Sequence, residues 1–318
     1  MRALSVISAM GGQDDRRSRA RSNRPCSILY STGGGPTVEG MYTCSIVIPV
    51  FNRVDLTTQC LRSLIANSSG VAYQVIIVDN GSTDGTAELC ARLGGNAVVI
   101  RNEENQGFAI ACNQGAAAAE SDLVVFLNND TEPEPGWLPP LLEPLHLQAD
   151  VGAVGAKLLF PNRTVQHAGV ILIERPDYPH LHAVHMPYHV PEDDPLANRR
   201  RDVSVATAAC LAVRRSAFEA AGGFDEGYWN GYEDVDLCLT LRSMDWRIVY
   251  EPRSVVIHHE SASGRERFIK VDDNVTRLQQ RWAGRAVPDI VMDGPTSWSL
   301  HPEAVLREGL GDLQLTLG

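Results

Sequence analysis

The sequence predicts an α/β fold with a mostly parallel sheet that carries helices on both faces. Apolar runs of strand length alternate with helical patterns over about 85 residues, and the connections between them are short. The chain has 318 residues, of which 44% are hydrophobic and 21% are charged. This composition excludes a mostly disordered chain, and the length allows one large domain or two small ones.

The first half of the chain shows the alternation most clearly. Residues 44–50 form a continuous apolar run, which is typical of a strand covered on both faces. The next segment places Cys60 and Leu64 on one helical stripe, and Ser82 or Asp84 is a suitable cap for the second helix. In chain order, the expected strands and helices span residues 44–50, 54–66, 74–79, 84–93, 97–100, 107–119 and 122–127.

The second half is less regular. Prolines surround a helix that is expected to end near Gln148. Residues 174–202 are polar and predict a long loop without regular structure, which is usually functional or mobile. Its four histidines are irregularly spaced, so we expect no metal site there. The other expected elements are strands at 152–160, 165–173, 203–213, 246–250 and 254–258, and helices at 233–244 and 265–282.

The two ends of the chain are predicted to lie outside the domain. Residues 1–40 contain six arginines and three acidic residues, lack periodicity, and end in a glycine-rich stretch, so we expect a disordered basic leader. Met41, directly before the first strand, favours a start codon assigned too early or a simple tail. The alternative is a basic arm that contacts an anionic membrane or a partner. Residues 284–318 are weakly patterned and are expected to form a C-terminal tail.

The body of the chain is strongly acidic. The net charge is −11, and it becomes −14 without residues 1–40, because 22 basic and 36 acidic residues remain. Such a chain is a poor candidate for nucleic-acid binding, which depends on cationic neutralisation of phosphates. The seven cysteines lack zinc or redox spacing and predict reduced, buried thiols in a cytoplasmic protein. No apolar run approaches the ~18 residues that cross a bilayer, so any membrane contact is expected to be peripheral, at the inner face.

Polar or glycine-rich residues follow four of the predicted strands, at 49–52, 79–84, 102–107 and 128–130. In an open parallel sheet, ligands bind beyond the carboxyl ends of the strands, so four such ends on one rim predict a binding site. Neither the Gly-x-Gly-x-x-Gly pattern after the first strand nor the Gly-x-x-x-x-Gly-Lys-Ser/Thr pattern is present. This argues against a dinucleotide dehydrogenase and a P-loop enzyme.

The order of these motifs resembles that of family 2 glycosyltransferases, which have the GT-A nucleotide-sugar-binding fold. The similarity spans roughly residues 42–283 and is greatest to the bacterial branch that includes rhamnosyltransferases of surface polysaccharide assembly. It implies a Rossmann-like sheet in a domain of residues 41–283, with a nucleotide-binding half at 41–131 and an acceptor half at 132–283. The matching blocks are SIVIPVFN at 45–52, IVDNGSTDG at 77–85, NQGFA at 105–109 with Asn113 and Gly115, LNNDT at 127–131, GGFDE at 222–226, EDVDL at 233–237 and IHHES at 257–261.

The resemblance places a nucleoside diphosphate sugar in the first half. Asp79 ends a buried strand and corresponds to the family position that recognises the imide of uracil or thymine; the alternative is a side-chain turn that leads into Gly81. Phe51 is expected either to stack on the base or to belong to the core. The nucleotide contacts implied by the resemblance are Pro49, Phe51, Asn52, Asp79, Asn105, Gly107, Asn113 and Asn129.

Residues 128–130 take the place of the family's Asp-x-Asp metal motif, but the first carboxylate is missing. Mg²⁺ is commonly held by one or two carboxylates together with substrate phosphates, so Asp130 suffices where the diphosphate completes the shell. The resemblance adds one histidine, and His258 aligns better than His259. Imidazole suits Mn²⁺ more than Mg²⁺. The alternative is a polar turn closed by Asp130.

Glu233, Asp234 and Asp236 crowd one predicted helix start. Acidic residues in a first turn also complement the helix dipole, which is the role we expect for Asp236. Asp234 and Asp236 are two positions apart and therefore face different sides of the helix. The resemblance assigns the catalytic base to Asp234 and leaves Glu233 to hold the acceptor or to orient the loop.

The resemblance implies an inverting transfer of a sugar from a UDP- or dTDP-sugar to a hydroxyl of a glycan or lipid-linked acceptor, in polysaccharide or glycoconjugate biosynthesis. Asp234 would act as general base and a divalent cation at Asp130 as Lewis acid. A non-catalytic nucleotide-sugar or glycan-binding module is the alternative, motivated by the missing carboxylate. The block at 166–169, Gln-His-Ala-Gly, also resembles relatives and receives no role from the sequence.

Overall fold

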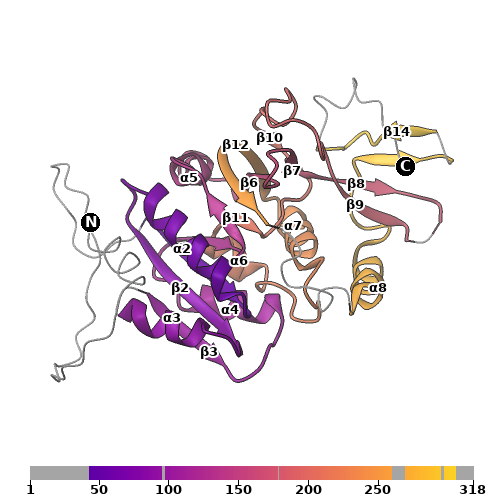
Figure 1. Ribbon diagram of the computed structural model, residues 1–318. Coiled ribbons are helices and arrows are strands. Elements are labelled where there is room, and N and C mark those ends of the chain that lie inside the picture. The colour runs from indigo at the N-terminus through magenta and orange to yellow at the C-terminus, as the bar shows by residue number, and fades with distance from the viewer. Residues whose placement is uncertain (1–42, 95–96, 178, 260–268, 295–296, 306–318) are drawn as a thin grey trace, which may run out of the picture.

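A computed structural model describes residues 43–94, 97–177, 179–259, 269–294 and 297–305. The predicted basic leader lies outside the described residues, as does the first part of the last predicted helix, 265–268. In chain order (Figure 1), the elements are β1 (Cys44–Val50), α2 (Val54–Asn67), β2 (Tyr73–Asn80), α3 (Thr86–Leu93), β3 (Val98–Asn102), α4 (Phe108–Ala117), β4 (Leu123–Leu127), β5 (Thr131–Pro133), α5 (Leu138–Leu147), β6 (Val151–Leu159), β7 (Val165–His167), β8 (Val170–Glu174), β9 (Leu181–His185), β10 (Arg201–Asp202), β11 (Cys210–Arg214), α6 (Arg215–Ala220), α7 (Glu233–Ser243), β12 (Arg247–His258), α8 (Val271–Trp282), β13 (Ile290–Met292) and β14 (Trp298–Leu300).

One large mixed sheet runs through the molecule. Strands β3, β2, β1 and β4 lie side by side and are all parallel, as the sequence predicts. Strand β11 is antiparallel to both β4 and β6, and β12 runs parallel to β6. Because β2 and β4 flank β1, the strand order reverses at β1, and ligands of open α/β sheets bind at such a point. Within the described residues, the path of the sheet is β10-β12-β6-β11-β4-β1-β2-β3.

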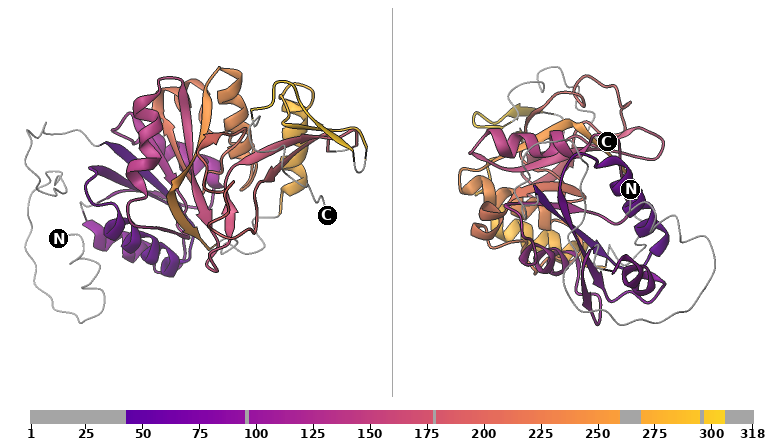
Figure 2. Two further views of the ribbon diagram at one scale, coloured as in Figure 1. Left: turned by 90° about the horizontal axis from the view of Figure 1, so that it is seen from above. Right: turned by 90° about the vertical axis from the view of Figure 1, so that its left-hand side faces the viewer.

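Alternating side chains of the central strands build two cores. Val47 of β1 and Phe126 of β4 pack on the face that α4 and α7 cover. Ile48 and Val125 pack on the opposite face, against α2, α3 and α5. Figure 2 shows helices on both sides of the sheet. Because both faces are covered, β4 is apolar at every position and β1 at every position except Ser45, whose buried hydroxyl donates to Gln74.

The region expected to be a long loop is partly ordered in strands. Residues 174–202 contain β9 and β10, and β9 pairs antiparallel with β8 over Val170–Glu174. The expected strand at 203–213 is confined to β11, and the two expected strands at 246–258 are one bulged strand, β12. The polar composition of residues 174–202 hid β9, because two histidines interrupt a short strand whose Ala183 and Val184 pack on the core.

The segment after Ala283, expected to be a tail, also belongs to the fold. Strand β13 runs parallel to β8, with Ile290 opposite Ile173, and β14 pairs antiparallel with β13. Together with β9 they form a second sheet in the order β14-β13-β8-β9. Figure 1 shows this small sheet at the opposite end of the molecule from β3, next to α8. Because β13 pairs with a strand that is far away in the chain, the sequence around residues 290–292 has no local pattern that predicts a strand.

Six cysteines lie within the described residues, and all six are buried and free, which confirms the expectation of reduced thiols for this part of the chain. Burial raises the pKa of the Cys60 thiol to about 12, because a thiolate is poorly solvated in the core. None of the described helices combines the length and the apolar character that crossing a bilayer requires.

Gly115 sets the distance between α4 and β1. A Cβ atom at Gly115 would lie 2.3 Å from Cγ1 of Val47. We therefore expect Gly115→Ala to lower the free energy of unfolding by about 1–3 kcal/mol through overpacking, measured by urea unfolding. Gly85→Ala is the matched control, because its Cβ would have its nearest contact at 3.7 Å. Equal stability of the two variants would contradict this account of helix placement.

Candidate active site

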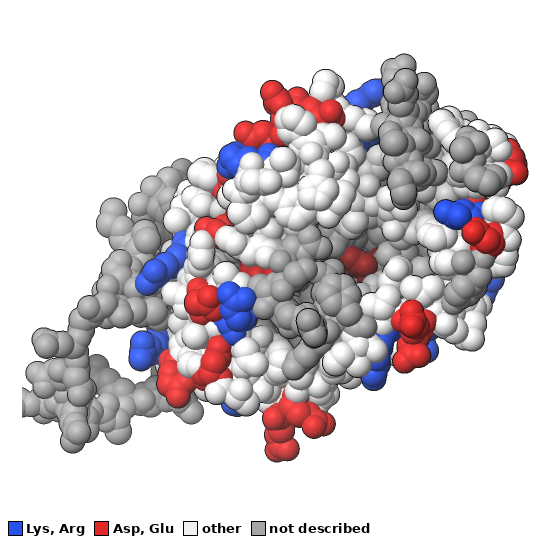
Figure 3. All heavy atoms as spheres, turned by 45° about the vertical axis from the view of Figure 1, so that its right-hand side comes forward, with Lys and Arg blue, Asp and Glu red and all other residues white. Residues whose placement is uncertain are grey.

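The residues that follow β1 and β4 meet the start of α7 in a pocket of about 460 Å³. Asp130, after β4, and Asp234, in the first turn of α7, both line this pocket. On the face drawn in Figure 3, an acidic side chain lies inside a hollow, and most of the described atoms beside it are uncharged. The residues predicted from the sequence that line the pocket are Pro49, Phe51, Asn105, Asn129, Asp130, Glu233, Asp234 and His258.

Pairing of β5 with β12 brings Asp130 beside His258. Thr131 lies opposite His258 in the register of the two strands, and the backbone N–H of His259 donates to the Asp130 carbonyl at 2.9 Å. The Nε2 atom of His258 lies 3.2 Å from Oδ1 of Asp130, and both residues are less than a tenth exposed. The ring of His259 instead pairs with Glu132. Of His258 and His259, His258 is therefore the one that lines the pocket.

Gln166 of β7 orients the His258 ring. Its Oε1 atom accepts a hydrogen bond from His258 Nδ1 at 2.7 Å, and its amide group donates to the His258 carbonyl at 3.4 Å. With the proton on Nδ1, Nε2 directs a lone pair at the Asp130 carboxylate. Sequence analysis found the Gln166 block but could not see its partner, because the two residues are far apart in the chain.

This arrangement fits a divalent cation. An imidazole lone pair and a carboxylate oxygen that face each other at 3.2 Å are suited to share a positive charge, and a hydrogen bond to the second ring nitrogen is typical of ligating histidines. Within the described residues, no cluster of three or more His, Cys, Asp or Glu side chains suited to a metal is found. Substrate phosphates and water are the ligands that commonly complete the shell of a cation held by so few side chains.

Backbone amides hold the two acidic residues at the start of α7. Oδ2 of Asp234 accepts the N–H of Ala208 at 3.1 Å, and Oδ1 accepts the N–H of Val235 at 2.8 Å. Oε2 of Glu233 accepts the N–H of Gly231 at 2.6 Å. These hydrogen bonds fix both carboxyl groups in the pocket wall at the N-terminus of α7.

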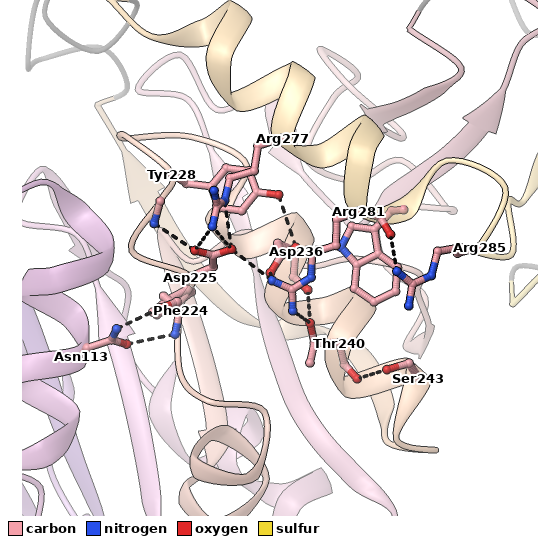
Figure 4. A network of polar contacts seen from close by, with 12 residues as sticks. Asn113, Phe224, Asp225, Tyr228, Asp236, Thr240, Ser243, Arg277, Arg281 and Arg285 are labelled. Atoms are coloured by element: carbon pink, nitrogen blue, oxygen red, sulfur yellow. Dashed lines mark hydrogen bonds and ion pairs between the residues drawn. The ribbon is translucent and has the colours of Figure 1, made fainter.

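Asp236 points away from the pocket, toward α8. Its Oδ1 atom accepts hydrogen bonds from Trp282 Nε1 at 2.7 Å and from the Tyr228 hydroxyl at 3.3 Å, and Arg281 lies 3.2 Å from Oδ2. Burial raises the pKa of Asp236, while Trp282 and Arg281 act in the opposite direction. Figure 4 shows the network between the two helices. Asp236 thus anchors α8 to α7, a larger role than the helix-dipole role expected from the sequence.

Asp79 is buried outside the pocket lining. Its Oδ1 atom accepts the N–H of Ser82 at 2.9 Å, which closes the turn that contains Gly81, and its other oxygen pairs with Arg101. Two roles were considered for Asp79, a contact to the base and a side-chain turn that leads into Gly81. The structure shows the turn. Contact with a base stays a prediction, and Arg101, which the sequence analysis did not single out, would stand beside such a base.

Three other predicted nucleotide residues, Asn52, Gly107 and Asn113, are also not among the residues that line the pocket. Asn52 accepts the N–H of Thr83 at 2.8 Å and so joins the loops after β1 and β2. Gly107 adopts a φ of 88° directly before α4. Asn113 donates to the Phe224 carbonyl and accepts its N–H, each at 2.9 Å (Figure 4). In the structure, these three residues position the loops around the pocket.

Two asparagines missed by the sequence analysis hold the loop before α7. Asn274 of α8 accepts the N–H of Trp229 at 3.0 Å and donates to the carbonyls of Trp229 and Gly231 at 2.8 and 2.9 Å. Asn230 accepts the N–H of Phe108, the first residue of α4, at 2.9 Å. Both asparagines also line the pocket. The loop that leads to Asp234 is therefore clamped between α4 and α8.

Comparison with known proteins identifies the family. A family model described as Glycosyl transferase family 2 matches residues 45–222, more than half of the chain. The chain belongs to glycosyltransferase family 2. This glycosyltransferase is 35% identical over 273 residues to the O-antigen biosynthesis protein RfbC of Myxococcus xanthus, which covers 83% of this chain and 20% of that protein. The chain therefore spans about a fifth of the length of RfbC.

A second relative is the N-acetylglucosaminyl-diphospho-decaprenol L-rhamnosyltransferase of Mycobacterium tuberculosis. It is 32% identical over 209 residues, which are 59% of this chain and 67% of that protein. These relatives confirm the expected resemblance to rhamnosyltransferase-like enzymes of polysaccharide biosynthesis.

Solved structures share the fold. The crystal structure of GalNAc-T7 with UDP, GalNAc and Mn²⁺ matches with a TM-score of 0.55 and 18% identity, over 69% of this chain and 43% of that chain. The crystal structure of S. aureus TarS matches with a TM-score of 0.53 and 17% identity, over 74% and 39% of the two chains. The expected α/β GT-A fold is thereby confirmed.

Removal of the Asn274 side chain should loosen the loop before α7. Asn274→Ala leaves one N–H and two carbonyls of this partly buried loop without their partner, so we expect a loss of about 1–3 kcal/mol in the free energy of unfolding. Hydrogen exchange at Trp229 and Gly231 should accelerate at the same time. Gln279→Ala, on the same helix, is the matched control, because Gln279 bonds to the backbone of Leu181 instead. Unchanged exchange at Trp229 in Asn274→Ala would contradict the clamp.

Proposed function

We propose that this glycosyltransferase moves a sugar from a nucleoside diphosphate sugar to an acceptor hydroxyl with inversion at the anomeric carbon. The observation that carries the proposal is that the Asp130–His258 pair and Asp234 line one pocket. One pocket therefore holds a candidate cation site for a diphosphate and a candidate base for a hydroxyl. We propose a UDP- or dTDP-sugar as donor; the GalNAc-T7 structure, which contains UDP, supports this choice.

We further propose that the acceptor is a glycan or a lipid-linked sugar in polysaccharide biosynthesis. The names of the relatives support this class, since one is an O-antigen biosynthesis protein and the other is named for a diphospho-decaprenol substrate. A lipid-linked acceptor would bring the enzyme to the inner face of a membrane as a peripheral protein.

Asp234 is the base of the proposed reaction. One carboxylate oxygen accepts the proton of the acceptor hydroxyl while the hydroxyl oxygen attacks the anomeric carbon from the side opposite the diphosphate. The bond between the anomeric carbon and the diphosphate oxygen breaks, and the nucleoside diphosphate leaves. The hydrogen bonds from Ala208 and Val235 fix the carboxylate, so its orientation needs no adjustment during the reaction. Glu233 acts on the loop, because it accepts the N–H of Gly231.

Asp130 and His258 would hold the divalent cation of the proposed site. A bound Mn²⁺ or Mg²⁺ would neutralise negative charge on the leaving diphosphate. Gln166 keeps the His258 ring in the orientation and tautomer that ligation requires. The Mn²⁺ in the GalNAc-T7 structure supports a divalent cation for this fold.

Asp234→Asn tests the base. The variant keeps its size and its hydrogen bond from Ala208 but cannot accept the proton, so we expect kcat to fall by about 10²–10⁴-fold with little change in donor affinity. The measurement is release of free nucleoside diphosphate from a panel of UDP- and dTDP-sugars. Asp245→Asn, in the exposed turn after α7, is the control. Near-normal turnover of Asp234→Asn would overturn the assignment.

The same assay separates the enzyme from the alternative, a non-catalytic binding module suggested by the missing first carboxylate of residues 128–130. A module of that kind binds nucleotide sugars and releases no nucleoside diphosphate in the presence of any acceptor. Turnover by the wild-type protein excludes it.

Asp130→Asn tests the cation site. Loss of the carboxylate charge should weaken UDP binding in the presence of Mn²⁺ by at least about tenfold, while binding in EDTA stays as in the wild type. Isothermal titration of UDP with and without Mn²⁺ measures both values. Glu132→Gln is the control, because Glu132 pairs with His259 and is not among the pocket residues. Equal Mn²⁺ dependence in wild type and Asp130→Asn would contradict the site.

A further inference from the structure

Two asparagines that line the pocket, Asn105 and Asn230, hold the backbone where α4 begins. Oδ1 of Asn105 accepts the N–H of Gly107 at 2.9 Å, and Oδ1 of Asn230 accepts the N–H of Phe108, also at 2.9 Å. Asn105 belongs to the loop after β3, and Asn230 belongs to the loop before α7. Because Gly107 and Phe108 are consecutive, the side-chain amides of two distant loops meet at one point of the pocket wall.

These contacts determine the orientation of both side-chain amides. A backbone N–H can only donate, so the amide atom that faces it is the oxygen, and the N–H2 group of each asparagine is left for another partner. No residue of the described chain accepts a hydrogen bond from Nδ2 of Asn105 or of Asn230. Since both residues line the pocket, their two N–H2 groups are available to a bound molecule.

Asn80, at the end of β2, fixes the Asn105 side chain. Asn80 is 4% exposed, and its Nδ2 atom donates to Oδ1 of Asn105 at 2.9 Å and to the Gly107 carbonyl at 3.0 Å. Its Oδ1 atom accepts from Nδ2 of Asn102 at 2.9 Å and from the N–H of Gln106 at 3.1 Å. The Asn80 amide therefore has a partner for each of its atoms, and the orientation of Asn105 is set before any ligand binds.

The Asn105–Asn230 pair lies between the two parts of the pocket that the proposed reaction uses. Through Asn80, Asn105 is joined to the carboxyl end of β2, on the side of the nucleotide-binding half. Asn230 precedes the proposed base, Asp234, by four residues in the same loop and helix start. In the proposed reaction, the transferred sugar lies between the nucleoside diphosphate and the base. The transferred sugar is therefore the part of the donor that reaches this pair.

We propose that Asn105 and Asn230 recognise the transferred sugar of the donor, each by donating a hydrogen bond from Nδ2 to a hydroxyl oxygen of that sugar, and that Asn80 is a positioning residue for Asn105. This inference rests on the proposed function and adds the group that this wall of the pocket selects, which is a hydroxylated sugar ring with two oxygens in reach of the pair. Rigidly held donors discriminate between sugars, because an analogue without the matching oxygen leaves a donor unpaired.

The side-chain amide resonances of Asn105 and Asn230 test which part of the donor the pair contacts. The probes are UDP, dTDP, UDP-glucose, UDP-galactose, UDP-N-acetylglucosamine and dTDP-L-rhamnose, each with Mg²⁺. At least one nucleotide sugar should shift the ¹H–¹⁵N resonances of both Nδ2 groups relative to the matching nucleoside diphosphate. Equal shifts with the nucleoside diphosphate alone, which would indicate a contact to the nucleotide, overturn the proposal. Absence of a shift with every nucleotide sugar overturns it as well.

Asn105→Asp and Asn230→Asp test the hydrogen bonds. In each variant one carboxylate oxygen still accepts the backbone N–H, while the second oxygen cannot donate to a sugar. The measured quantity is the ratio of the Kd of the nucleoside diphosphate to the Kd of the nucleotide sugar, so that an effect of the added charge on the diphosphate cancels. We expect this ratio to fall by about threefold to tenfold in each variant, the loss of one hydrogen bond.

Gln106→Glu is the matched control, because it adds the same charge at an exposed neighbouring residue that is not among those lining the pocket. Its ratio should equal that of the wild type. A ratio in Asn105→Asp or in Asn230→Asp that equals the ratio of this control overturns the proposal.

Asn80→Ser tests the positioning role. It should lower the same ratio and abolish the sugar-dependent shift of Asn105, with the Kd of the nucleoside diphosphate unchanged; an unaltered Asn105 shift contradicts that role. All of these readouts measure binding. Sugar-dependent shifts without release of nucleoside diphosphate would therefore overturn the proposed transfer and support the pair. Sugar transfer with unchanged ratios would overturn the pair and leave the proposed transfer intact.

Discussion

The antiparallel pairing of β5 with β12 is the constraint on which the site depends. These strands are far apart in the chain, and their register sets Thr131 opposite His258 and Glu132 opposite Ile257. The pairing places the Asp130 carboxylate against the His258 ring in a buried position. Without it, Asp130 would only close a turn after β4. The reversal of strand order at β1 and the antiparallel β11, which joins the two halves, bring the start of α7 to the same place.

Sequence patterns were sufficient for the elements that are buried on both faces. The expected run at 44–50 is strand β1, and the helix expected at 233–244 is α7 with one residue fewer. Sequence patterns were insufficient for strands whose pairing partners are far away in the chain. Strand β9 carries a histidine on each of its faces, and β13 is a short strand that pairs with β8, more than a hundred residues earlier. The second sheet forms only when these strands pair with one another, and the sequence of no single strand predicts it.

The residues of the site also fall into those that the sequence identified and those that it did not. Asp130, Asp234 and His258 were found because each stands at an element boundary in a recognisable block, and they do line one pocket. Gln166 was left without a role and Asn274 was missed, because each acts through a hydrogen bond to a residue far away in the chain. Residue type alone does not reveal such partners.

A crystal structure of the protein with Mn²⁺ and an intact UDP- or dTDP-sugar tests the central claim most directly, which is that cation, donor and base meet in one pocket. The account predicts Mn²⁺ bound to Oδ1 of Asp130, to Nε2 of His258 and to the diphosphate, with the anomeric carbon between the ion and Asp234. A diphosphate bound outside this pocket, or an ion held by other side chains, would contradict it.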